Sequence, residues 1–357
     1  MSKIGIIGHF AKGLNASDGQ TIKTRMLEAE LSEALEEKVN TVDTCNWKKN
    51  PFSLLFNCLR LLHTSSDIIV LPDTNGIRVL IPLLITLNYL FRKKIHYVVI
   101  GGWLPDFLKE HFQYRFFVKK INSIHVESYT MIERLKDIGL NHAYYMPNFK
   151  RLNPLSEREL ILEQNMPYKL CTFSRVLKEK GIETAIEAVT QINEKYGETV
   201  YTLDIYGAVD SDYKERFSTL LNTTKEFISY RGVVAYDRTI EILKDYFILL
   251  FPTYYSSEGF AGTLLDAFAS GLPVLASDWK YNREIVADGI NGYIYSLEKE
   301  SLQAKLEEIL KEPASILKLR PNCLKEYQKY SPDSVIKRFL YNAELSQKQG
   351  EIFGVSE

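Results

Sequence analysis

Two acidic side chains flank the start of an expected helix in the stretch SSEGFAGTLLDAFASG, residues 256–271. Glu258 precedes a turn that contains Gly259 and Gly262, and Asp266 follows Glu258 by eight positions. The apolar run FILLFPT before the stretch is typical of a buried strand, and TLLDAFAS predicts a helix that begins near Thr263. Free N–H groups at a helix start bind anions, so the amides of residues 261–264 predict an anion site. We expect Glu258 in the loop and Asp266 in the first helical turn. A purely structural role for Asp266 stays open, because the helix dipole favours an acid there in any protein.

Two cations form a second candidate site in CTFSRVLKEKGIETAIEAV, residues 171–189. Arg175 follows an expected strand, and Lys180 and Gly181 precede an expected helix. A guanidinium fork and an ammonium group at the carboxyl end of a strand can bind a diphosphate. The alternative is that both cations are ordinary surface charge.

Parallel sheets must position these side chains, because short apolar runs alternate with helix-period segments along the chain. In the first half the expected strands are 3–10, 67–72, 95–102, 123–128 and 143–148. In the second half they are 169–176, 201–207, 227–232, 247–253, 272–277 and 292–296. Three prolines between residues 147 and 167 indicate a domain boundary near 148–168. The predicted fold class is therefore α/β, with two doubly wound parallel-sheet halves.

The composition and the missing motifs disfavour several classes of protein. Charged residues make up 25% of the 357-residue chain and apolar residues 45%, which is typical of a globular protein. The four cysteines form no CxxC pair, so neither a zinc site nor a disulfide framework is predicted. GIIGHFAKG lacks the GxGxxG of a dinucleotide-binding strand, and GLNASDGQT lacks the lysine of a P-loop. An NAD-dependent oxidoreductase and a P-loop enzyme are thus disfavoured, and we expect no nucleic-acid partner.

Charge and hydropathy also bear on location. Residues 1–150 hold 19 Lys and Arg against 14 Asp and Glu, and the rest of the chain holds 25 against 31. The run VLIPLLITLNYLF, residues 79–91, is too short to span a bilayer, so we expect a buried helix, with a monotopic membrane helix as the alternative. The first residues contain no signal-like apolar region, and we expect a cytoplasmic protein.

Together the motifs resemble the retaining family-4 glycosyltransferases, within the glycosyl transferases group 1, most strongly from about Thr172 to Tyr295. SRVLKEKGIETAIEAV is similar to the family's phosphate motif, and SSEGFAGTLLDAFASG is similar to its paired-acid signature. YMPN resembles its hinge phrase, and GLNASDGQTIKTRMLEAEL, which includes Gly19, resembles its first loop and helix. The likeness implies a GT-B fold of two Rossmann-like domains that face a central cleft. Residues 1–150 would form the acceptor domain and 151–330 the donor domain, with a helix at about 331–350 packing back on the first.

The resemblance also implies roles for residues of a metal-independent, hexosyltransferase-like enzyme without cofactor. Arg175 and Lys180 would neutralise the diphosphate of a nucleotide diphosphate sugar as it leaves, and Glu258 would hold hydroxyls of the donor sugar. The family carries Glu where this chain has Asp266, so the implied ribose contact would come from a side chain one methylene shorter. The donor-binding positions that the resemblance implies are Gly19, Gly259, Phe260, Ala261, Gly262, Thr263 and Asp266.

The acceptor is implied only in outline, as a saccharide or a polyprenyl-diphosphate-linked saccharide in capsular, exo- or O-polysaccharide biosynthesis. Relatives carry a histidine after the strand that ends here at Ile100, whereas this chain reads Gly101-Gly102-Trp103, and none of His9, His111 and His125 is assigned as the acceptor-side base. Two other functions stay open: a sugar-nucleotide epimerase on the same fold, and a non-catalytic partner of an active transferase.

A membrane surface is a further candidate partner, at the inner face of the plasma membrane. Basic residues interleave with aromatic ones in residues 91–120, a mixture typical of membrane-contacting surfaces; the alternative is core aromatics with a solvated rim. The residues are Arg92, Lys93, Lys94, Arg115, Lys119 and Lys120, with Phe91, Trp103, Phe107, Phe112 and Phe116.

Overall fold

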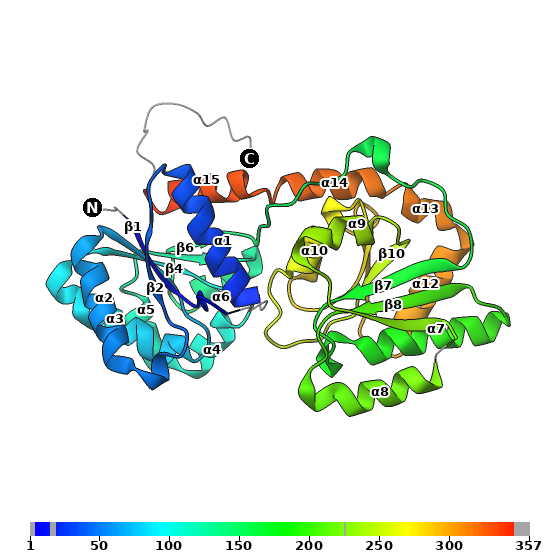
Figure 1. The fold of residues 1–357 in the computed structure, drawn as a ribbon, viewed down its shortest axis with the longest axis horizontal. Helices are drawn as coiled ribbons and strands as arrows, with labels where there is room; N and C mark the ends of the chain where they lie inside the picture. Colours follow the sequence, from blue (N-terminus) through cyan, green and yellow to red (C-terminus); the bar gives the residue numbers. More distant parts are fainter. Residues whose placement is uncertain (1–3, 15–18, 225, 346–357) are drawn as a thin grey trace. The chain divides into compact units, whose positions relative to one another are not determined.

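The computed structural model describes residues 4–14, 19–224 and 226–345, which form two compact units (Figure 1). Unit 1 contains the described residues up to Ile100, Leu104–Pro147 and the described residues from Pro332 onward. Unit 2 contains Gly101–Trp103 and Asn148–Ser331. None of the helices in the described ranges combines the length and the apolar character that crossing a bilayer requires.

Unit 1 is built on a six-stranded parallel sheet with the order β2-β1-β3-β4-β5-β6. Its strands are β1 (Ile4–Gly8), β2 (Asn40–Asp43), β3 (Asp67–Leu71), β4 (Lys94–Val98), β5 (Ser123–Val126) and β6 (Ala143–Tyr145). All five residues of β1 are buried, as expected for a strand covered on both faces. The edge strand β2 was not among the expected strands, because Val42 is its only buried residue.

Helices cover both faces of this sheet. The chain moves from β1 to the edge strand β2 through one crossover and then reverses, so right-handed crossovers place α1 on one face and α2 and α3 on the other. The closing helix α15 packs against α1. The helices of unit 1 are α1 (Gly19–Ala34), α2 (Pro51–Thr64), α3 (Gly76–Phe91), α4 (Leu104–Glu110), α5 (Arg115–Val118), α6 (Tyr129–Lys136) and α15 (Pro332–Asn342).

Unit 2 repeats this architecture with the strand order β12-β11-β10-β7-β8-β9. The strands are β7 (Tyr168–Phe173), β8 (Tyr201–Tyr206), β9 (Ile228–Gly232), β10 (Ile248–Phe251), β11 (Val274–Ser277) and β12 (Gly292–Tyr295). The helices are α7 (Ile182–Tyr196), α8 (Lys214–Thr223), α9 (Thr239–Leu243), α10 (Gly262–Ala269), α11 (Asn282–Ile285), α12 (Ser301–Lys311), α13 (Pro313–Leu317) and α14 (Arg320–Gln328). Every residue of β10 and β11 is buried. The centre of the sheet is therefore rigidly packed, and the loops that leave these strands begin from fixed points.

A buried polar chain crosses the sheet of unit 1. The hydroxyl of Ser123 contacts Nδ1 of His96 at 2.7 Å and Nε2 of His125 at 2.8 Å. The ring of His125 also packs against Phe339 of α15, with ring centroids 4.6 Å apart. Burial, followed by the charge of His96, lowers the pKa of His125 to about 3.

Acid is therefore expected to destabilise unit 1. The unfolded pKa of a histidine, about 6.5, exceeds the folded pKa of His125, so the unfolded chain binds the proton first. The stabilisation is complete above about pH 6.5 and is lost as the pH falls toward 3. At pH 5 the loss amounts to about 2 kcal/mol. Denaturant unfolding at pH 7 and pH 5 should show this difference, and His125→Gln should remove most of it. The same change at exposed His63 is the control; an equal effect there would contradict the assignment.

Candidate functional site

The turn after β7 carries both predicted cations. Arg175 is exposed, whereas Lys180 is 9% exposed and ends a 3₁₀ turn, η4 (Lys178–Lys180). Gly181 follows with φ 72°, and a Cβ atom there would lie 2.0 Å from the carbonyl oxygen of Pro252. Only glycine fits this left-handed, crowded position, so Gly181 allows the turn to bring Lys180 against the end of β10.

Gly181→Ala is expected to destabilise the protein by about 2–4 kcal/mol, because it combines left-handed strain with a steric clash. Gly197 at the other end of α7 is a matched control, since its φ is 67° and a Cβ atom there would meet nothing within 4 Å. Gly197→Ala should therefore lower the free energy of unfolding by only about 1 kcal/mol. Equal losses in denaturant unfolding would show that the contact with Pro252 has no effect.

The loop after β10 brings Glu258 to Lys180. Because β7 and β10 are parallel neighbours, their carboxyl ends meet at the same edge of the sheet. The carboxylate of Glu258, 7% exposed, lies 2.6 Å from the ammonium nitrogen of Lys180. The hydroxyl of Thr253 donates to the same oxygen, Oε2, at 2.7 Å. Both hydrogen bonds that the structure gives this carboxylate thus end on Oε2, which leaves Oε1 for a ligand.

Both cations of the site lie close to the ring of Tyr255. The guanidinium of Arg175 lies 5.5 Å and the ammonium of Lys180 lies 5.2 Å from the ring centroid of Tyr255. Two cations against one ring and one carboxylate leave the cluster with a net positive charge. This arrangement suits an anion such as a diphosphate.

The N-terminus of α10 lies at the end of the same loop. The helix begins at Gly262 after Ala261, and Thr263 follows with an Oγ1 atom that is buried and has no hydrogen-bond partner among the described residues. Buried hydroxyls are normally hydrogen-bonded, so this orphan indicates a place for a ligand or water. Gly259 and Phe260 are buried before it, and the side chain of Asn148 donates to the carbonyl of Phe260 at 3.0 Å.

Asp266 differs from the sequence prediction. The helix starts at Gly262, so Asp266 lies in the second turn, and its placement in the first turn was wrong. Its carboxylate is 2% exposed, pairs with the ammonium group of Lys150 and accepts a hydrogen bond from Thr239 at 3.3 Å. Asp266 is thus held by partners from distant parts of unit 2.

Gly19 and the glycines after Ile100 were also considered from the sequence. Gly19 is the first residue of α1 and belongs to unit 1. Within unit 2, the backbone N–H of Gly102 donates to the carbonyl of Ser257 at 3.3 Å, and a Cβ atom on Gly102 would lie 2.2 Å from the carbonyl oxygen of Glu258. The glycines that replace the family's histidine are thus packed directly against the Glu258 loop.

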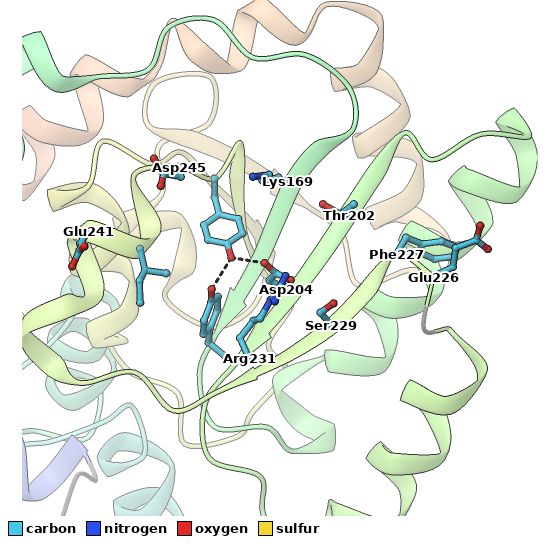
Figure 2. Close-up of a pocket in the computed structure, with 12 residues that line it drawn as sticks. Lys169, Thr202, Asp204, Glu226, Phe227, Ser229, Arg231, Glu241 and Asp245 are labelled. Carbon is cyan, nitrogen blue, oxygen red and sulfur yellow. Dashed lines mark hydrogen bonds and ion pairs between the residues drawn. The ribbon is translucent and has the colours of Figure 1, made fainter.

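A separate cavity of about 520 Å³ lies over β8 and β9, and none of its lining residues belongs to the Lys180–Glu258 cluster (Figure 2). Its floor is a network in which Arg231 and Tyr246 both donate to Asp204, at 2.8 and 2.6 Å, and the hydroxyls of Tyr206 and Tyr246 lie 2.7 Å apart. The hydrogen-bonding groups of this network pair with one another. We therefore take the Glu258 loop, and not this cavity, as the candidate active site.

The described residues contain no candidate metal site. Within residues 4–14, 19–224 and 226–345, no group of three or more His, Cys, Asp or Glu side chains could hold a metal ion. In the acidic stretch DSD, residues 210–212, the carboxylate of Asp210 accepts a hydrogen bond from the backbone N–H of Asp212 at 3.1 Å. That contact caps a 3₁₀ turn.

Comparison with known proteins identifies relatives of part of the chain. Residues 156–329 match the model of the family described as glycosyl transferases group 1. The UDP-N-acetylglucosamine–peptide N-acetylglucosaminyltransferase GtfA subunit of Streptococcus pneumoniae is 31% identical over 143 residues, which cover 40% of this chain and 27% of that protein. The alpha-monoglucosyldiacylglycerol synthase of S. pneumoniae is 23% identical over 248 residues, 65% of this chain and 54% of that protein. The chain thus spans about a quarter to a half of the length of these curated relatives.

Solved structures show the fold. Anabaena Alr3699/HepE in complex with UDP and glucose superposes with a TM-score of 0.74 at 13% identity, covering 96% of this chain and 99% of that one. The lipopolysaccharide outer core galactosyltransferase WaaB superposes with a TM-score of 0.67 at 15% identity, covering 98% and 100%. The predicted α/β fold class, GT-B with two parallel-sheet units, is confirmed. The residues that match the glycosyl transferases group 1 model, 156–329, lie within unit 2 and contain Arg175, Lys180 and Glu258.

Proposed function

We propose that this protein is a retaining glycosyltransferase that moves a sugar from a nucleotide diphosphate sugar to a saccharide or lipid-linked saccharide. The observation that carries the proposal is the buried contact between Lys180 and Glu258, with Arg175 nearby. The contact lies at the carboxyl end of β10, and the loop that contains Glu258 leads into α10. Such a transfer needs positive groups that stabilise the leaving diphosphate. It also needs a carboxylate that binds the sugar hydroxyls.

The leaving group is stabilised electrostatically in this proposal. Cleavage of the bond between sugar and phosphate builds negative charge on the departing diphosphate and positive charge on the sugar ring. Arg175, which is exposed, approaches the diphosphate as a planar fork, and Lys180 adds a point charge. The amides of Ala261, Gly262 and Thr263 receive the distal phosphate. Such preorganised groups supply the largest stabilisation that an active site offers, and we propose that no divalent metal is required.

Glu258 orients the donor sugar. Its Oε2 is occupied by Lys180 and Thr253, so Oε1 accepts from a sugar hydroxyl. The negative carboxylate also favours positive charge that develops on the nearby ring. We propose that Asp266 accepts a ribose hydroxyl as well, because a carboxylate can accept more hydrogen bonds than the two from Lys150 and Thr239.

The relatives guide the choice of substrates to test. The GtfA subunit is named for UDP-N-acetylglucosamine, the Anabaena structure contains UDP and glucose, and the S. pneumoniae synthase is named for a monoglucosyldiacylglycerol. We therefore propose a UDP-sugar donor and a saccharide or polyprenyl-diphosphate-linked acceptor. A cytoplasmic step of surface-polysaccharide synthesis is the process that such substrates suit.

A thermal-shift series with UDP, GDP, ADP and their sugars tests donor binding. A ligand at 100 times its dissociation constant stabilises the native state by about 2.7 kcal/mol. For a unit of this size we expect the melting temperature to rise by about 5–10 °C, with or without EDTA. Lys178→Ala changes an exposed lysine of the same turn and should keep the shift, whereas Lys180→Ala should lose most of it.

The outcomes separate the alternatives. A melting temperature that no nucleotide diphosphate raises would contradict the proposed donor site. An epimerised free sugar formed without acceptor would identify an epimerase instead. Donor binding without turnover of any acceptor or donor would identify a non-catalytic partner.

A further inference from the structure

The outer face of α3 is mostly apolar, and no described residue of unit 1 covers it. Val79, Thr86 and Leu90 are exposed and Leu83 is half-buried, and they follow one another at helical spacing. Between Arg78 and Arg92 the helix contains no charged residue. Three of these four side chains are apolar, and an exposed apolar stripe of this kind is typical of a surface that contacts a partner or a membrane.

The neighbouring helices extend this stripe. Within unit 1, α2 packs against α3 and α3 against α5, on the sheet face opposite α1. Together these helices and the turn η2 (Phe112–Tyr114) carry seven large apolar side chains that are 43–82% exposed; we call this the α2–α3–α5 surface. Its members are Phe52, Phe56, Val79, Tyr89, Leu90, Phe112 and Phe116. Of the aromatics considered from the sequence, Trp103 and Phe107 are instead buried.

The chain segment that carries the α2–α3–α5 surface is rich in positive charge. Residues 44–122 hold 11 Lys and Arg against 4 Asp and Glu, whereas the remaining residues hold 33 against 41. The ammonium of Lys120 lies over two exposed rings, 5.5 Å from the centroid of Tyr89 and 5.0 Å from that of Phe116. None of the ion pairs that the structure gives among described residues involves Lys119 or Lys120. These charges are thus available to an external anion.

We infer that the α2–α3–α5 surface docks on an anionic lipid bilayer. Exposed aromatic and aliphatic side chains enter the boundary between headgroups and acyl chains, and lysines and arginines bind the anionic headgroups. A second copy of the chain fits less well, because two such surfaces would bring like charges together. The inference deepens the proposed function, because it names the surface that would bring the protein to a lipid-linked acceptor. Only this link to the acceptor rests on the proposed function; binding to the bilayer does not.

Vesicle flotation of the full chain tests the inference. We expect binding to vesicles of phosphatidylcholine with 30% phosphatidylglycerol at 50 mM salt, little binding to phosphatidylcholine alone, and release at 500 mM salt. Lys119→Glu/Lys120→Glu should weaken binding at least tenfold. Lys311→Glu/Lys318→Glu makes the same change of net charge at two exposed positions of unit 2 and should bind as the unchanged protein does. Phe112→Ser/Phe116→Ser, with the charge intact, should also weaken binding.

Either of two results would overturn the inference: no binding of the unchanged chain to the anionic vesicles, or equal losses in the two charge variants. Dimerisation through this surface would also overturn the inference. It would appear as a doubled mass in solution that Phe112→Ser/Phe116→Ser abolishes. The nucleotide-induced thermal shift of Lys119→Glu/Lys120→Glu should stay unchanged. Its retention alongside lost flotation separates failure of the lipid surface from failure of the donor site.

Discussion

Glu258→Gln is expected to lower the rate of sugar transfer by about two to three orders of magnitude, the range found for loss of one preorganised electrostatic group. Glutamine keeps the size of the side chain and can still accept from Thr253, but it removes the negative charge that faces Lys180 and the sugar ring. The buried ammonium of Lys180 then lacks its counter-charge, so stability should fall by about 1–3 kcal/mol without unfolding. Initial rates and denaturant unfolding measure both effects.

The control for this variant is Glu179→Gln. Glu179 is an exposed acid in the turn that contains Lys180, and its known contacts with Thr253 and Tyr254 use its backbone carbonyl. Its replacement should leave transfer within about twofold of the original rate, since surface substitutions away from such contacts are usually nearly neutral. Full activity of Glu258→Gln would refute the proposed role of Glu258.

Lys180→Ala is expected to lower transfer by a similar two to three orders of magnitude, because the departing diphosphate loses its buried cation. It also leaves the carboxylate of Glu258 without its ion-pair partner, so the two positions should be coupled. In a double-mutant cycle, the combined variant should lose less activity than the product of the two single losses. Strict additivity in the measured kcat/KM values would show that the residues act independently. Lys178→Ala should retain activity.

The central elements of both units were predictable, because buried parallel strands appear in the sequence as short apolar runs. Strand β2 was missed, since only Val42 in it is buried. The contact between Lys180 and Glu258 was not predicted, because it depends on β7 and β10 being neighbours in the sheet, although both residues were placed after strands, where ligands bind in such sheets.

Other parts of the site were not predictable. Lys150 pairs with Asp266 across 116 positions, and no spacing rule connects the two. Thr239 reaches Asp266 from α9 in the same way. The predicted start of α10, near Thr263, is one residue later than the observed start at Gly262, because Ala261 and Gly262 lack the side-chain oxygen that marks most helix starts. Side-chain contacts between distant segments thus needed the structure.

The tight packing of Gly102 limits which substitutions the protein can accept at this position. Grafting a histidine onto this position, to copy the family's usual residue, would drive its side chain into the main chain of Glu258, because even a methyl group would approach that carbonyl oxygen to 2.2 Å. A library that randomises residue 102 should consequently yield few folded, active members unless the loop at 256–259 is redesigned at the same time.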